Sequence, residues 1–172
     1  MKRLTQAERE EVEMHNMLVE RSARIAEAVW QSGGEYIIEN PVDRGRGAKH
    51  AQDGFENHAP LWMMEEITTL RTRTRAKTID TPQCEMGGAY QKLTTLMYTE
   101  GLADAMRAMG ELRCGHKKHA KAAKGYEEKK RGKQRRQWGS AKAAAYPKRM
   151  NERIMDAIAR VWPTDTRPMV PR

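Results

Sequence analysis

The feature that most constrains this chain is a block of positive charge in its second half. Between residues 113 and 149 there are 14 Lys and Arg residues and two acids, Glu127 and Glu128, so the block carries a net charge of +12. The rest of the chain has 18 basic and 21 acidic residues and sums to −3. Because the charge is local, we expect three parts: an α/β domain over residues 1–112, a basic and partly flexible segment over 113–146, and a C-terminal helix with its tail over 147–172.

A block of this kind indicates a polyanionic partner, because each Lys or Arg that meets a phosphate releases a condensed counterion. We expect a nucleic acid, with DNA favoured over RNA, and Tyr126 and Trp138 lie where they could stack on bases. The expected phosphate contacts are Lys117, Lys118, Lys129, Lys130, Arg131, Lys133, Arg135 and Arg136. The alternative is a solvated linker that keeps the protein in solution.

The composition also excludes some classes of protein. The chain has no run of 18 apolar residues, which excludes a membrane-spanning helix and a membrane partner. Its first residues, MKRLTQAEREEVEMHN, lack the apolar core of a secretory signal. Two cysteines cannot form a disulfide framework, so a reducing, intracellular compartment is expected, with cytoplasm and nucleus both open.

The first helix is predicted over residues 5–31, before the glycine pair at 33–34. Its apolar residues recur at helical spacing with charges on the other faces, which predicts a stripe that packs on a core. The stripe consists of Met14, Leu18, Ile25 and Val29.

The remaining pattern predicts short strands alternating with helices, which is typical of an α/β fold. Strands are expected over residues 35–39, 77–81 and 93–98, and helices over 61–70, 101–112 and 147–162. The last helix should turn Met150, Ile154, Ile158 and Val161 inward. Residues 42–60 form a loop long enough to suggest function. Because three strands leave an exposed sheet edge, we expect part of the fold to be missing or supplied by a partner.

Several short motifs occur in a fixed order between residues 14 and 162. They are Glu39-Asn40-Pro41, Gln83-Cys84-Glu85-Met86-Gly87, Lys92-Leu93-Thr94, Cys114 with His116 and His119, and Ala144-Ala145-Tyr146-Pro147. In this order the chain resembles the C-terminal half of a Rossmann-type, S-adenosylmethionine-dependent methyltransferase, nearest to the class that methylates cytosine C5 in DNA. The resemblance is closest to degenerate domains in viral, algal and mobile-element reading frames. It implies a partial Rossmann-like sheet of about three strands, the last one antiparallel, flanked by helices.

The resemblance implies roles for four residues. Glu39 would protonate N3 of a flipped cytosine, which makes C6 electrophilic, and Asn40 would brace the loop. Gln91 is what remains of a DNA-contacting Gln-x-Arg-x-Arg motif, and Lys92 would replace part of that contact. The alternative for Glu39 and Asn40 is a polar strand end followed by an Asn-Pro turn.

Other parts of such an enzyme have no counterpart in the sequence. There is no Gly-rich turn or acidic strand end for the cofactor, and no Pro-Cys loop before the Glu39 strand. The resemblance therefore implies that S-adenosylmethionine binds only with a complementary N-terminal half, either a separate chain or the missing part of a longer reading frame. We expect the chain to be inactive alone.

Both cysteines and two of the five histidines belong to one predicted cluster. Cys114, His116 and His119 lie within six residues, and the inferred topology brings Cys84 near them. Thiolate and imidazole ligands suit tetrahedral Zn²⁺, so we predict a structural zinc site formed by these four residues. The alternative is a buried Cys84 beside a basic patch whose histidines meet phosphate.

Three functions stay open at this point. The first is a methyltransferase-like half-domain that acts on DNA with a complementary half. The second is a non-enzymatic, basic nucleic-acid-binding protein on a degenerate methyltransferase scaffold. The third is an interaction module that docks a partner, or a second copy of itself, through its sheet edge and its methionine-rich helices, since the chain has 12 methionines.

Overall fold

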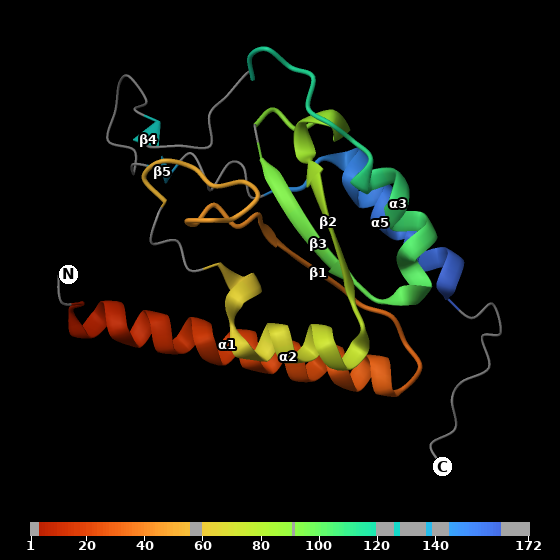
Figure 1. The fold of residues 1–172 in the computed structure, drawn as a ribbon, viewed down its shortest axis with the longest axis horizontal. Helices are drawn as coiled ribbons and strands as arrows, with labels where there is room; N and C mark the ends of the chain where they lie inside the picture. The colour runs from red at the N-terminus through yellow and green to blue at the C-terminus, as the bar shows by residue number, and fades with distance from the viewer. Residues whose placement is uncertain are drawn as a thin grey trace. The chain divides into compact units, whose positions relative to one another are not determined.

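The structure is a computed structural model that describes residues 4–55, 60–90, 92–119, 126–127, 137–138 and 145–162. Within these ranges the chain is a mixed α/β protein (Figure 1). Its helices are α1 (Gln6–Gln31), α2 (Glu65–Thr74), α3 (Ala103–Gly110) and α5 (Lys148–Val161), with short 3₁₀ helices η1 (Leu61–Met63), η2 (Gln83–Met86) and η3 (Glu100–Leu102). Its strands are β1 (Ile37–Pro41), β2 (Lys77–Pro82), β3 (Leu93–Tyr98), β4 (Tyr126–Glu127) and β5 (Gln137–Trp138). None of the described helices is both long and apolar enough to cross a membrane.

The chain divides into two compact units. The first contains residues 1–81 and 93–100, and therefore α1, α2 and the three-stranded sheet. The second contains residues 82–92 and 101–172, and therefore η2, α3 and α5. The predicted metal ligands all belong to the second unit.

The sheet of the first unit has the strand order β1-β3-β2, which confirms the three expected strands. The central strand, β3, runs antiparallel to its neighbours. Its register with β1 pairs Ile37 with Tyr98 at one end and Pro41 with Thr94 at the other. Pro41 has no N–H to donate, and the next backbone hydrogen bond runs from the Val42 N–H to the Leu93 carbonyl at 3.3 Å. The two outer strands thus run in the same direction on either side of β3, and α2 lies between them in the sequence.

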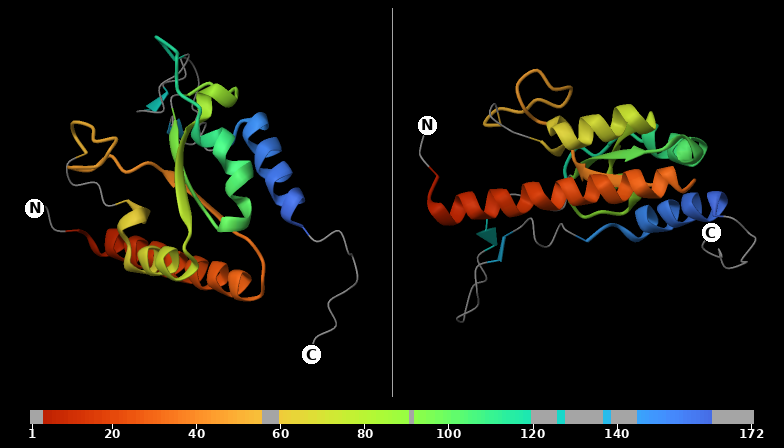
Figure 2. Two further views of the ribbon diagram at one scale, coloured as in Figure 1. Left: turned by 45° about the vertical axis from the view of Figure 1, so that its right-hand side comes forward. Right: turned by 90° about the horizontal axis from the view of Figure 1, so that it is seen from below.

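The core of the first unit lies between the sheet and the helix pair α1 and α2, which run side by side (Figures 1 and 2). Its buried residues are Ala23, Ala26, Tyr36, Ile67, Leu70, Ala76 and Met97. The Tyr36 hydroxyl shares a hydrogen bond of 2.6 Å with Thr74 Oγ1, so the one polar group of this aromatic core residue is satisfied.

The predicted inward stripe of α1 is wrong. Its four residues face solvent: Met14 (49% exposed), Leu18 (50%), Ile25 (65%) and Val29 (39%). The buried residues of α1 are Ala23 and Ala26, about 120° away around the helix at 100° per residue. Their methyl side chains let α1 approach α2 closely, so the larger apolar residues are left on another face of the helix.

The second predicted helix also has different bounds. Residues 61–63 form a 3₁₀ turn, and Met64 is extended, with φ −68° and ψ 139°, before α2 begins at Glu65. The helix then continues past the predicted end to Thr74. It stops because Arg75 adopts the left-handed conformation, with φ 54°, and donates its N–H back to the last turn.

In the second unit α3 packs against α5. The predicted inward face of α5 holds: Met150 is fully buried, and Ile154, Ile158 and Val161 are half-buried. The predicted helix over 101–112 is a short 3₁₀ turn followed by α3, whose Met106 is fully buried. Within the basic block, the backbones of 126–127 and 137–138 form a two-stranded antiparallel pair.

Candidate metal centre

Four metal-ligating side chains of the second unit converge on one point. Cys84 comes from η2, and Cys114, His116 and His119 come from the stretch that follows α3. One ligand atom from each lies within 4.8 Å of all the others, and both cysteines are free thiols. The structure therefore brings together all four residues that the sequence predicts as ligands, and the cluster could hold a metal ion.

The distances between the ligand atoms suit a tetrahedral ion. Cys114 Sγ lies 3.5 Å from Cys84 Sγ, 3.1 Å from His119 Nε2 and 3.7 Å from His116 Nδ1. Zn–S bonds of about 2.3 Å and Zn–N bonds of about 2.0 Å place tetrahedral ligands about 3.3–3.8 Å apart. The three distances from Cys114 lie near this range, and all ligand atoms of the cluster lie within 4.8 Å of one another, so the side chains would adjust to close around an ion. Two thiolates and two neutral imidazoles would also neutralise the charge of a divalent ion.

A tight turn after β2 presents Cys84. The Gln83 N–H donates to the Lys92 carbonyl at 2.9 Å, and Gly87 takes a positive φ of 90°. A Cβ on Gly88 would lie 2.9 Å from the Gln83 carbonyl oxygen and 3.1 Å from Pro147 Cγ. This close approach lets η2 pack against α5, which fixes one side of the cluster.

Glu85 positions the other side of the cluster, although the sequence analysis gave it no role beyond its place in the Gln-Cys-x-x-Gly motif. Its Oε1 accepts the Gly115 N–H at 3.2 Å and lies 3.1 Å from His116 Nδ1. The carboxylate thus holds both the backbone and the imidazole of the loop beside Cys114. This is the same nitrogen that faces Cys114 Sγ, so a metal bound through His116 Nδ1 would take the place of its contact with Glu85.

The two thiols differ in acidity. Burial, and then the neighbouring Cys114, raises the pKa of Cys84 to about 11. Hydrogen bonds from His116 lower the pKa of Cys114 to about 7. The pKa of His116 is raised, first by Cys114 and then by Glu85. Cys114 is therefore the thiol that most readily supplies a thiolate at neutral pH. The Cys84 thiol would lose its proton when it binds a metal ion.

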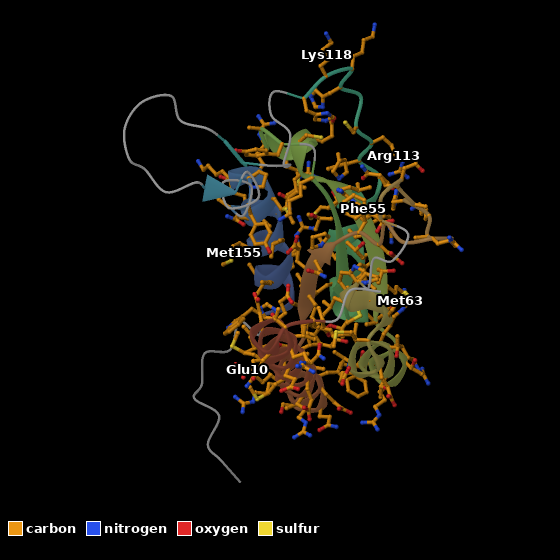
Figure 3. The ribbon with its side chains drawn as sticks, turned by 90° about the vertical axis from the view of Figure 1, so that its left-hand side faces the viewer. Glu10, Phe55, Met63, Arg113, Lys118 and Met155 are labelled. Carbon is orange, nitrogen blue, oxygen red and sulfur yellow. The ribbon has the colours of Figure 1, made fainter. Side chains whose placement is uncertain are left out.

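Lys117 and Lys118 lie inside the loop closed by His116 and His119, and both are exposed. Figure 3 shows Lys118 at the outer end of this loop, with its side chain directed outward. Since the ammonium group is held away from the ligands, solvent screens its repulsion of a cation. Both lysines are accessible to an anionic partner.

The residues with roles implied by the methyltransferase resemblance lie in both units. Glu39 and Asn40 are consecutive residues of β1, so their side chains leave opposite faces of the sheet. Lys92 Nζ lies 5.2 Å from the ring centre of Tyr146, a cation–π contact. Gln91 lies outside the described residues. The roles of these residues stay predictions.

Six of the eight predicted phosphate contacts also lie outside the residues that the structure describes. They are Lys129, Lys130, Arg131, Lys133, Arg135 and Arg136. Tyr126 and Trp138 are described by their backbone alone. Contacts of these residues with phosphate therefore stay a prediction from the charge pattern.

A polar cluster that the sequence pattern does not predict lies in the first unit, around Asp80. Asp80 Oδ2 accepts from Lys49 Nζ at 3.0 Å and lies 2.9 Å from His50 Nε2, while Oδ1 accepts from Thr95 Oγ1 at 2.8 Å. Burial tends to raise the pKa of Asp80, but the hydrogen bonds from His50, Thr95 and Lys49 outweigh it and lower that pKa. The only signal in the sequence was the long loop 42–60, which carries two of these groups.

This cluster lines one wall of a cavity of about 210 Å³. Trp62 forms part of the same cavity and donates its Nε1–H to the Pro41 carbonyl at 2.9 Å. The lining combines cationic, anionic and apolar groups, and the Asp80 carboxylate already contacts three side chains. The cluster ties the 42–60 loop to the sheet.

Comparisons with known protein families, with curated proteins and with solved structures find no match for this chain. The methyltransferase resemblance therefore rests on the sequence motifs alone. The converging Cys and His ligands, by contrast, are a geometric finding, and we base the functional argument on them.

Proposed function

We propose that this protein is a zinc-stabilised nucleic-acid-binding protein. The observation that carries the proposal is the convergence of Cys84, Cys114, His116 and His119 within 4.8 Å at the point where the basic block begins. Zinc is the metal that this donor set suits best, because Cys₂His₂ sets are typical of tetrahedral structural zinc sites.

The role of zinc would be to cross-link two segments. It would join the η2 turn to the chain after α3, which are 30 residues apart in the sequence. A loop with two ligands, His116 and His119, would then present Lys117 and Lys118 in one conformation. Ordering these cations before binding lowers the entropic cost of meeting a phosphate backbone.

The basic block would supply most of the affinity for nucleic acid. Its 14 Lys and Arg residues can neutralise several phosphates, and such contacts carry little sequence information. We therefore expect sequence-tolerant binding to duplex DNA that weakens steeply as salt is added. Single-stranded RNA of the same length, measured in parallel, is expected to bind more weakly.

The test is the salt dependence of binding to a fluorescent DNA duplex, followed by anisotropy. Replacing Lys117 and Lys118 together by Gln should weaken binding and reduce the slope of log K against log salt by about 2, because each lost phosphate contact removes about 0.9. The matched control replaces two exposed arginines of α5, Arg153 and Arg160, by Gln and should leave the slope unchanged. Equal slopes for both double variants would contradict the proposal.

The second candidate function is the methyltransferase-like half-domain that the motifs imply. What supports it is the strand order, in which the last strand is antiparallel to the two others, as that resemblance implies. Binding of S-adenosylmethionine would come from a complementary half. In a complex with such a half, Glu39→Gln should abolish methyl transfer and leave DNA binding intact. Full activity of that variant would remove Glu39 from the mechanism.

A further inference from the structure

The exposed apolar stripe of α1 indicates a surface that a second protein covers. A helix with this pattern normally packs the stripe on a core, yet four of its large apolar residues are 39–65% exposed. The core face of α1 is supplied instead by Ala23 and Ala26. The helix thus has two separate apolar faces, and within the described structure only one of them is packed.

Three of the four stripe residues, Met14, Leu18 and Ile25, fall on the a and d positions of a heptad pattern, and Val29 falls beside it on an e position. With Leu18 taken as position a, the a and d positions along α1 are Ala7, Glu11, Met14, Leu18, Arg21, Ile25 and Ala28. All seven residues are exposed. Five of them are apolar, and the spacing of three and four residues is that of a two-helix seam. The 26 residues of α1 provide more than three heptads for such a seam.

The two charged residues at these a and d positions, Glu11 and Arg21, indicate which partner fits this side of α1. Glu11 and Arg21 make no ion pair or hydrogen bond with any residue that the structure describes. They are placed symmetrically about position 16, near the middle of α1. If a second α1 packs antiparallel about that midpoint, Glu11 lies opposite the partner's Arg21, and Arg21 lies opposite the partner's Glu11.

The same antiparallel register matches the apolar positions. Met14 would lie opposite the partner's Leu18, and Ala7 opposite the partner's Ile25, so a small residue meets a large one. At the edge of the seam, Glu10 would face the partner's Arg24. Figure 3 shows Glu10 on the side of α1 away from α2.

A parallel arrangement of the same helices is disfavoured. It would place Glu11 against the partner's Glu11 and Arg21 against the partner's Arg21, and like charges in a helix seam are destabilising. The charge pattern of the stripe is therefore self-complementary in one orientation only.

We propose that the protein forms a homodimer through antiparallel packing of the exposed α1 stripe of each copy, centred near residue 16. This interface is independent of the zinc site and of the nucleic-acid contacts. The dimer would carry two basic blocks, which raises the effective concentration of the second block once the first has bound.

The test is the mass of the full 172-residue chain in sedimentation velocity over a range of concentrations. A concentration-dependent species of twice 19.7 kDa is expected. Replacing Leu18 and Ile25 together by Glu should leave only monomer, whereas Met155→Glu, an equally exposed apolar position on α5, should leave the dimer intact. Circular dichroism of each variant checks that it folds.

A charge swap tests the orientation. Glu11→Arg alone, and Arg21→Glu alone, should each raise the dissociation constant of the dimer about tenfold or more, because each change places like charges across the seam. Combining the two should restore the wild-type constant. A wild-type chain that stays monomeric up to its solubility limit would overturn the proposal, as would a dimer unaffected by the Leu18 and Ile25 replacements. Failure of the combined variant to recover would overturn the antiparallel register.

Discussion

At the scale of single residues, Cys114 organises the candidate metal centre. Its thiol contacts Cys84, His116 and His119, and it is the group whose pKa, at about 7, lies nearest to neutrality. The sequence could predict the ligands because Cys and His are few and three of them are close together along the chain. It could not predict Glu85, because a surface glutamate gives no signal until a partner 30 residues away is in place.

Asp80 provides a test at this scale. Because its carboxylate accepts hydrogen bonds from three side chains, Asp80→Asn should lower the free energy of unfolding at pH 7 by about 2 kcal/mol. Since the pKa of Asp80 is lowered by folding, its stabilising effect is present above the unfolded pKa of about 3.9 and is lost as the pH falls through the lower, folded value.

Urea unfolding of wild type and variant across acidic pH measures both effects. The wild type should lose more stability than Asp80→Asn between pH 5 and pH 2, as expected when a group with a lowered folded pKa is protonated. Asp104→Asn is the control, because its carboxylate is 90% exposed and pairs only along its own helix. A stability of Asp80→Asn equal to wild type at pH 7 would show that the cluster does not hold the 42–60 loop.

At the scale of elements, periodicity predicts where helices and strands lie but not which face they bury. The strands 77–81 and 93–98 were placed within one residue, and the inward face of α5 was found, because each has one apolar face. In α1 two apolar faces compete. The pattern predicts that the large residues Leu18 and Ile25 face the core. The helix packs instead through two alanines, which bury little apolar area but let the two helix backbones approach closely.

The η2 turn provides a test of an element. Gly88→Ala should lower the melting temperature, because its Cβ would lie 2.9 Å from a backbone carbonyl oxygen and 3.1 Å from Pro147. Overpacking of this kind costs about 1–3 kcal/mol. Gly115→Ala is the matched control, since its Cβ would meet no atom within 4 Å. Equal melting temperatures for the two variants would contradict the tight packing of η2 against α5.

At the scale of the whole molecule, a cluster that could hold a metal ion lies where a strongly charged segment begins. The sequence predicted both parts, because charge and ligand residues can be counted directly. It could not indicate the proposed dimer surface, because that proposal depends on one apolar face of α1 being packed and the other exposed. The methyltransferase resemblance stays a prediction, since the comparisons with protein families, curated proteins and solved structures find no match.

Removal of metal provides a test at this scale. A zinc chelator should lower the melting temperature of the wild type by about 5 °C or more, because an ion that binds only the folded state stabilises it. Equimolar zinc should restore it, together with the salt-dependent binding of DNA. In Cys114→Ser the chelator should have no further effect. An unchanged melting temperature in the wild type would show that the stability of the fold does not depend on a bound metal ion.

The most direct measurement of the central claim is the zinc content of the protein purified without added metal and without chelators. The account predicts one zinc per chain by elemental mass spectrometry, reduced to a small fraction in Cys114→Ser and in His119→Ala. It also predicts an unchanged content in His15→Ala, which replaces an exposed histidine outside the cluster. Wild-type protein without zinc, or with zinc that survives loss of Cys114, would contradict the account.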